Sequence, residues 1–150
     1  MRGREGSAMR NQDTHRKLHE LFNERQLDEM DHHVGAEFAY IDHPRRGTMH
    51  TLAQFKEWLG EWISAFSDAR VIGASYVDGP GFSVAYFHGR GENDGPLGKH
   101  EPTGRQMDMA FCETLRYDEH GRVIGGEVYY DQLTLLAQLG LVEQAATRRA

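Results

Sequence analysis

The spacing of apolar residues changes once along the chain. Before Ala69 apolar side chains recur at helical spacing, and after it they alternate with polar ones, which is the strand period. The first part predicts helices over residues 13–26, 27–34 and 51–66, with a short strand over 38–41. The second part predicts strands over 70–77, 82–90, 105–117 and 122–131 and a final helix over 132–141. Helices followed by an antiparallel meander predict an α+β fold.

Length and composition narrow the class of protein. We expect a flexible leader over residues 1–12, one folded domain over 13–142 and a C-terminal tail over 143–150. The net charge of −6 and the lack of a basic face argue against a nucleic-acid partner. No apolar run approaches the ~20 residues that span a bilayer, and the start lacks the apolar stretch of a signal peptide. With a single cysteine, Cys112, the chain suits a reducing compartment, so we expect a cytoplasmic protein without a membrane partner.

The strand over 105–117 places one acid, Glu113, on an apolar face. The residues of this face are Met107, Met109, Phe111, Glu113, Leu115 and Tyr117. Burial among them would raise the pKa of Glu113, and a raised pKa suits a general acid or base. The alternative is a structural role, in which Glu113 pairs with an arginine or lies at an open sheet end.

Four further polar residues are candidates for the same site. A four-residue turn over 118–121 would set Glu113 opposite Gly126, Phe111 opposite Val128 and Met109 opposite Tyr130. This register brings Tyr130 inside, whereas a packing role is its alternative. His88 lies on the face of Phe82, Val84 and Tyr86, as a catalyst or as a hydrogen-bonded core histidine. Asp42 lines the cavity mouth or caps its own loop, and Asp131 ends the last strand.

The histidines do not predict a metal site. His15 and His19 stand one helical turn apart, but they lie among charged residues on what we expect to be the solvated side. No residue nearby supplies a third ligand, and no His-Glu-x-x-His motif occurs. We therefore expect no metal and no cofactor. Cys112 is expected on the outward face without a histidine beside it, which argues against a cysteine nucleophile.

Three stretches of the sequence are distinctive together: Phe-Ser-Asp-Ala-Arg at 66–70, Pro-Thr-Gly-Arg at 102–105 and the run from Asp131 to Gly140. They resemble the SnoaL-like polyketide cyclase branch of the nuclear transport factor 2-like superfamily, and the resemblance covers 13–142. The resemblance implies a cone-shaped, curved antiparallel sheet wrapped around helices, with a deep pocket and a sheet-to-sheet homodimer. It also implies a base on the last strand and an assisting histidine on the strand before it. Val128 and Glu113 occupy these places here, and Asp131 resembles a carboxylate frequent in the wider branch.

Together these features predict a cofactor-independent enzyme that moves protons on a small, largely apolar carbonyl compound. Cyclisation, isomerisation and hydrolysis are all open. Glu113 or Asp131 would abstract the proton, and Tyr130 or His88 would donate a hydrogen bond to the oxyanion. The expected substrate-binding residues are Asp42, Met109, Phe111, Val128 and Trp62. The alternatives are a non-catalytic ligand-binding protein, or an assembly module with a small or closed cavity. A homodimer would use the outward face of Ala110, Cys112 and Thr114.

Overall fold

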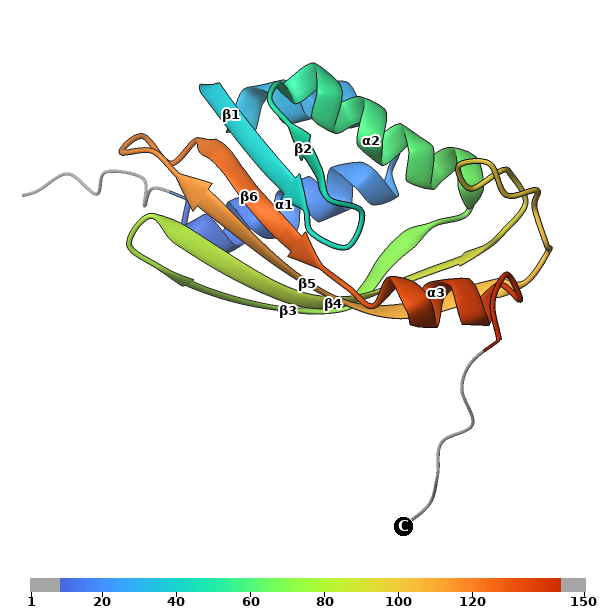
Figure 1. The fold of residues 1–150 in the computed structure, drawn as a ribbon. Helices are drawn as coiled ribbons and strands as arrows, with labels where there is room; N and C mark the ends of the chain where they lie inside the picture. The colour runs from blue at the N-terminus through green and yellow to red at the C-terminus, as the bar shows by residue number, and fades with distance from the viewer. Residues whose placement is uncertain (1–8, 144–150) are drawn as a thin grey trace, which may run out of the picture.

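One curved sheet of six strands and four helices make up the fold, which is α+β as predicted (Figure 1). The structure is a computed structural model, and it describes residues 9–143; residues 1–8 of the predicted leader over 1–12 and residues 144–150 of the predicted tail over 143–150 lie outside this range. The helices are α1 (Asn11–Asn23), the 3-10 helix η1 (Leu27–His33), α2 (Leu52–Ala65) and α3 (Gln132–Gln138). The strands are β1 (Val34–Asp42), β2 (Gly47–Met49), β3 (Arg70–Gly79), β4 (Phe82–Glu92), β5 (Gln106–Tyr117) and β6 (Val123–Tyr129).

The helices α1 and α2 lie on the same side of the sheet (Figure 1). The helix predicted over 51–66 forms as α2, and Thr51 is its N-cap: its side chain accepts a hydrogen bond from the backbone N–H of Gln54 at 3.1 Å. The Gln54 side chain accepts from the backbone N–H of His50. Trp62 of α2 packs edge-on against Phe111 of β5, so the helix covers the inner face of the sheet.

The sheet is open, with the strand order β2-β1-β6-β5-β4-β3. Strands β3 to β6 form the predicted antiparallel meander. The pairing of β1 with β6 is parallel, however, so the sheet is mixed. The short strand β2 pairs with β1 and was not predicted. No helix within residues 9–143 is long and apolar enough to cross a membrane.

The register between β5 and β6 differs from the predicted one by two residues. Glu113 lies opposite Val128, and Gly126 lies opposite Leu115. The cause is local: the pairing resumes only at Tyr117 and Val123, and the register shifts beside Arg116. A shift of two residues keeps Gly126 and Val128 on their predicted face, because side chains alternate with a period of two. At the start of β6 the irregularity turns Val123, in place of Arg122, towards the interior opposite Tyr117.

The predicted faces of β4 are reversed. Ser83, Ala85, Phe87 and Gly89 point inward, whereas Phe82, Val84, Tyr86 and His88 point outward. The pairing with β5 fixes this arrangement, since Ala85 lies opposite Glu113 and cross-strand partners share a face. The prediction was wrong because the outward face is itself apolar.

Candidate active site

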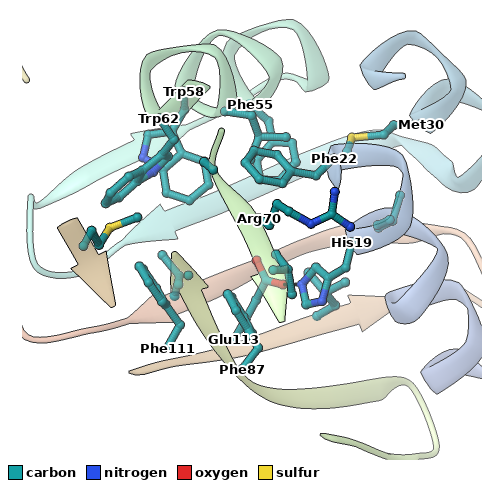
Figure 2. A pocket seen from close by; sticks show the side chains of 18 residues that line it. His19, Phe22, Met30, Phe55, Trp58, Trp62, Arg70, Phe87, Phe111 and Glu113 are labelled. Carbon is teal, nitrogen blue, oxygen red and sulfur yellow. Dashed lines mark hydrogen bonds and ion pairs between the residues drawn. The ribbon is translucent and has the colours of Figure 1, made fainter. Parts of the chain in front are cut away.

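A cavity of about 90 Å³ lies between α1, α2 and the inner face of the sheet (Figure 2). Its residues with a charged or titratable side chain are His19, Arg70 and Glu113. The others are Leu18, Phe22, Met30, Phe55, Trp58, Leu59, Trp62, Ala69, Val71, Phe87, Gly89, Met107, Phe111, Leu115 and Val128. Glu113 and His19 therefore border a space that is otherwise almost wholly apolar.

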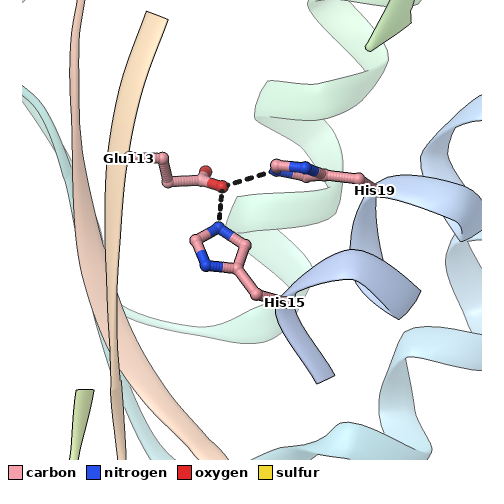
Figure 3. A group of neighbouring side chains, drawn as sticks. All are labelled: His15, His19 and Glu113. Atoms are coloured by element: carbon pink, nitrogen blue, oxygen red, sulfur yellow. Dashed lines mark hydrogen bonds and ion pairs between the residues drawn. The ribbon is translucent and has the colours of Figure 1, made fainter. Parts of the chain in front are cut away.

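Glu113 is the centre of a buried cluster of polar side chains (Figure 3). The Nε2 atoms of His15 and His19, both on α1, each lie 2.8 Å from its Oε1. The hydroxyl of Tyr40 on β1 donates a hydrogen bond to its Oε2. Glu113 is 7% exposed, His15 0% and His19 9%. Every oxygen of the carboxylate thus has a partner, as a buried charge requires.

Beyond Glu113, His15 continues a chain of hydroxyl groups into the protein interior. Its Nδ1 lies 2.7 Å from the Oγ of Ser83, which lies 2.7 Å from the hydroxyl of Tyr117. The Tyr117 hydroxyl donates to the backbone carbonyl of Asn11 at 2.9 Å. His15, Ser83 and Tyr117 are not among the cavity-lining residues, so this chain runs away from the cavity.

His19 makes a shorter connection and lines the cavity. Its Nδ1 lies 2.7 Å from the hydroxyl of Tyr76 on β3, and its ring packs edge-on against Phe87. The Tyr76 ring also lies under the guanidinium of Arg16 at 5.1 Å. Burial raises the pKa of Tyr76 to about 12, with the charge of Glu113 acting in the same direction, so this hydroxyl keeps its hydrogen.

The histidines reverse the predicted titration of Glu113. Burial by itself would raise its pKa, but the hydrogen bonds and charges of His15 and His19 hold it well below its ordinary value. The predicted rise was therefore wrong, and the cause is a pair of histidines instead of an arginine. Burial lowers the pKa of His15, because it outweighs the hydrogen bond and charge of Glu113. At neutral pH these directions give an ionised Glu113 beside an uncharged His15.

The prediction that His15 and His19 lie on the solvated side of their helix was wrong. Residues 15, 18, 19 and 22 are spaced as one helix face, and Leu18 and Phe22 are buried beside the two histidines. The charged neighbours occupy the other face. The helical spacing of the histidines from the apolar Leu18 and Phe22 was the signal in the sequence that could have identified them as buried.

His15, His19 and Glu113 are the group in the described chain whose ligand atoms converge, all within 4.8 Å of one another. Two histidines and a carboxylate form a donor set that transition metals accept. The separations of 2.8 Å between nitrogen and oxygen are those of hydrogen bonds. The absence of a metal from the function stays a prediction.

Three of the expected substrate-binding residues lie around the cavity with Glu113: Trp62, Phe111 and Val128. Met109 is buried in the core but does not line the cavity. Asp42 is also buried, and it borders a second, polar depression beside α2 instead.

Tyr130 and Asp42 form a separate pair. The Tyr130 hydroxyl donates to Oδ2 of Asp42 at 3.0 Å, and the indole N–H of Trp58 donates to the same oxygen at 2.9 Å. Tyr130 packs against Phe111 but does not line the cavity. The structure therefore does not place the Tyr130 hydroxyl beside Glu113.

His88 and Asp131 both lie away from the cavity. His88 is on the outer face of the sheet, where its Nδ1 lies 2.7 Å from Asp108. Asp131 is exposed and caps α3, accepting hydrogen bonds from the backbone and the hydroxyl of Thr134. Those hydrogen bonds lower the pKa of Asp131.

A curved open sheet around helices, with titratable groups in an apolar cavity, is the architecture of the ketosteroid isomerase-like fold. A structure of that fold from Catenulispora acidiphila DSM 44928, in complex with trimethylamine, superposes with a TM-score of 0.73 at 15% identity; it covers 87% of this chain and 94% of its own. The family model described as SnoaL-like polyketide cyclase matches residues 12–139. The chain therefore belongs to the SnoaL-like polyketide cyclase family.

Two further solved structures agree with this family. A proposed SnoaL-like polyketide cyclase from Jannaschia sp. CCS1 has a TM-score of 0.80 at 17% identity, covering 93% of this chain and 97% of its own. IdmH, a proposed polyketide cyclase from Streptomyces antibioticus, has a TM-score of 0.75 at 19% identity, with coverages of 87% and 99%. No curated protein matches the sequence. At these identities the likeness shows the fold, and the reaction has to be argued from the site.

Proposed function

We propose that this protein is a cofactor-free enzyme in which Glu113 takes a proton from the carbon next to a carbonyl group of a small apolar compound. The observation that carries the proposal is an ionised carboxylate in the wall of an apolar cavity, facing the space where a ligand would lie. The C–H electron pair would pass to the carbonyl oxygen as an enolate, and the proton to Glu113. Return of the proton to another carbon gives isomerisation, and attack of the enolate on a second carbonyl gives cyclisation.

Arg70 is the cation that the cavity offers to the enolate oxygen. It is exposed at the start of β3 and lines the cavity, and within residues 9–143 its guanidinium has no hydrogen-bond or ion-pair partner. A guanidinium donates several N–H groups and keeps its charge at all working pH values. We assign to Arg70 the oxyanion role that the sequence had suggested for Tyr130 or His88.

The cavity limits the size of the substrate. Its volume of about 90 Å³ is below the ~150 Å³ of an engineered cavity that holds benzene. A compound of a few carbon atoms would fit as the side chains stand. A larger ring system would need the aromatic side chains of α2 to move aside.

The test is hydrogen exchange on a small ketone. We expect the protein to catalyse exchange of the α-hydrogens of acetone, a ketone small enough for the cavity, in D₂O, followed by NMR. Glu113→Gln should lower the rate by ~10² or more, as loss of a general base does. Asp131→Asn is the matched control, because Asp131 is an exposed carboxylate outside the cavity, and it should keep the full rate. Equal rates for the native protein and Glu113→Gln would refute the proposal.

The small cavity favours one alternative, an assembly module that retains a remnant pocket. In that case acetone would neither bind nor exchange. Binding without exchange would indicate the other alternative, a ligand carrier. The hydrogen-bonded Glu113 cluster favours the enzyme, since neither alternative requires a charge in the cavity wall.

A homodimer through the outer face of the sheet is also part of the proposal. Tyr86, Cys112 and Tyr129 lie in one row across β4, β5 and β6. Tyr86 is 59% exposed and Tyr129 is 45% exposed, which leaves a contiguous apolar surface. We expect light scattering at micromolar concentration to give the mass of a dimer, and Tyr86→Glu to give that of a monomer. A monomeric native protein would exclude this interface.

A further inference from the structure

The chain of contacts from Glu113 through His15 contains one hydrogen too few. Four contacts link Glu113 to His15, His15 to Ser83, Ser83 to Tyr117, and Tyr117 to the Asn11 carbonyl. An uncharged His15 brings one hydrogen, and the two hydroxyl groups bring one each. An ionised carboxylate and a backbone carbonyl bring none. Three hydrogens therefore serve four contacts of 2.7–2.9 Å.

The backbone carbonyl of Asn11 fixes the direction of every hydrogen bond in this series, and so determines which contact lacks a hydrogen. A carbonyl only accepts, so the single hydrogen of Tyr117 points to Asn11. Ser83 must then donate to Tyr117, and His15 must donate to Ser83 from Nδ1. The contact between His15 and Glu113 is then the one without a hydrogen. When a fourth hydrogen is added there, His15 also donates from Nε2 to Glu113, and its ring is an imidazolium. Three donors on Glu113 favour its ionised form, so the added proton stays on His15.

We propose that the proton which Glu113 takes from the substrate is carried as an imidazolium on His15, positioned by Ser83 and Tyr117. His15 is a positioning residue here, because it acts through Glu113 and does not reach the cavity. The inference rests on the proposed function only for the source of the proton. It explains how a strongly acidic Glu113 can serve as a base: the pair has the basicity of His15.

The contacts of His19 with Glu113 and Tyr76, which we call the His19 arm, differ from the His15 arm, the contacts that run from Glu113 through His15 to Asn11. An uncharged His19 and Tyr76 bring two hydrogens to two contacts, so this arm is complete without a further proton. The groups that surround His15 come from α1 and four strands. They are His19 on α1, Tyr40 on β1, Tyr76 on β3, Ser83 on β4, and Glu113 and Tyr117 on β5.

The experiment is a ¹⁵N NMR titration of the histidine rings in the full-length, EDTA-treated protein without substrate. In the native protein His15 should be protonated at both nitrogens at the acid end of its titration. Tyr117→Phe removes one hydrogen and two contacts, so the uncharged ring becomes fully bonded through Ser83. The midpoint should then move to about tenfold higher proton concentration, which is the effect of one hydrogen bond to a charged group.

Two further variants keep the result decisive. Ser83→Ala removes the acceptor of the Nδ1 hydrogen and should move the midpoint in the same direction, even if Tyr117→Phe folds poorly. Tyr76→Phe is the matched control on the His19 arm. It keeps the aromatic ring beside His15 and removes only a hydroxyl that bonds to His19, so it should leave the His15 midpoint within about twofold.

Three outcomes would overturn the inference. The His15 midpoint could be unchanged in both variants, or Tyr76→Phe could move it equally. The ring signals could also respond only to added Zn²⁺, in which case a metal supplies the missing positive charge. None of these outcomes depends on turnover. Failure of the proposed function would appear separately, as acetone exchange that Glu113→Gln leaves intact.

Discussion

His15 and His19 share a helix, a residue type and an acceptor atom, yet they do different things. His15 is fully buried and joins Glu113 to a chain of hydroxyl groups that ends at a backbone carbonyl. His19 lines the cavity and ends at the hydroxyl of Tyr76. The difference follows from one helical turn: the first histidine faces Ser83 inside the sheet, and the second faces Phe87 at the cavity. Two residues of the same type on one helix thus have different roles: His15 is proposed to carry a proton, and His19 lines the cavity.

Removing the acceptor that both arms share should have the largest effect. Glu113→Leu leaves His15, His19 and the Tyr40 hydroxyl without their common partner in a buried site. We expect the free energy of unfolding to fall by about 3–5 kcal/mol, the cost of breaking a buried charged network. Urea unfolding measures it. Glu113→Gln is the control, since its amide oxygen can still accept from Tyr40, and its loss should be smaller. A Leu variant within about 1 kcal/mol of the native protein would mean that the network contributes little.

Removing one arm at a time sharpens the comparison. His15→Phe removes one hydrogen-bond partner each from Ser83 and Glu113 in the interior. His19→Phe removes one partner each from Tyr76 and Glu113 next to the cavity. We expect a loss of about 2–3 kcal/mol for the first variant and about 1–2 kcal/mol for the second, from the cost of buried unpaired polar groups. Thermal or urea unfolding of both proteins gives the ranking. The reverse ranking would show that the cavity-side arm carries the structure.

Lowering the pH should change the free energy of unfolding through His15, and this effect should be smaller than those of the substitutions above. Burial lowers the folded-state pKa of His15, so its contribution to stability is present above the unfolded value of 6.5 and is lost as the pH falls from there towards the folded value. One proton gives a slope of at most about 1.4 kcal/mol per pH unit. His15→Asn should flatten the pH dependence of the unfolding free energy in this window. A slope that survives in His15→Asn would assign the proton uptake to another group.

Local patterns predicted the parts of the fold that depend on neighbouring residues. The helix predicted over 51–66 forms as α2, and the alternation of β5 correctly placed Glu113 on the buried face. The β5–β6 register failed because a longer turn and a register shift are invisible in the alternation. On β4 both faces carry apolar side chains, so periodicity alone had no way to choose between them, and His88 was placed on the wrong one.

The site itself depended on contacts between distant parts of the chain. His15 and His19 lie 98 and 94 residues from Glu113, and no local pattern relates positions so far apart. The charged residues around the two histidines favoured a solvated face, although the spacing from Leu18 and Phe22 pointed inward. Packing of α1 against β3 and β4 is what turns that face towards the sheet.

The parallel pairing of β1 with β6 has a consequence for the order of folding. Strand β1 ends at Asp42, but its partner begins only at Val123, so the pairing closes a loop of some eighty residues. Contacts of such long range form slowly, because the chain entropy of loop closure is lost before they contribute. On the ribosome, β1 is synthesised early and can pair with β2, but its other edge stays open until β6 has emerged. The Glu113 cluster, which needs β1, β5 and α1 together, is therefore completed among the last steps of folding.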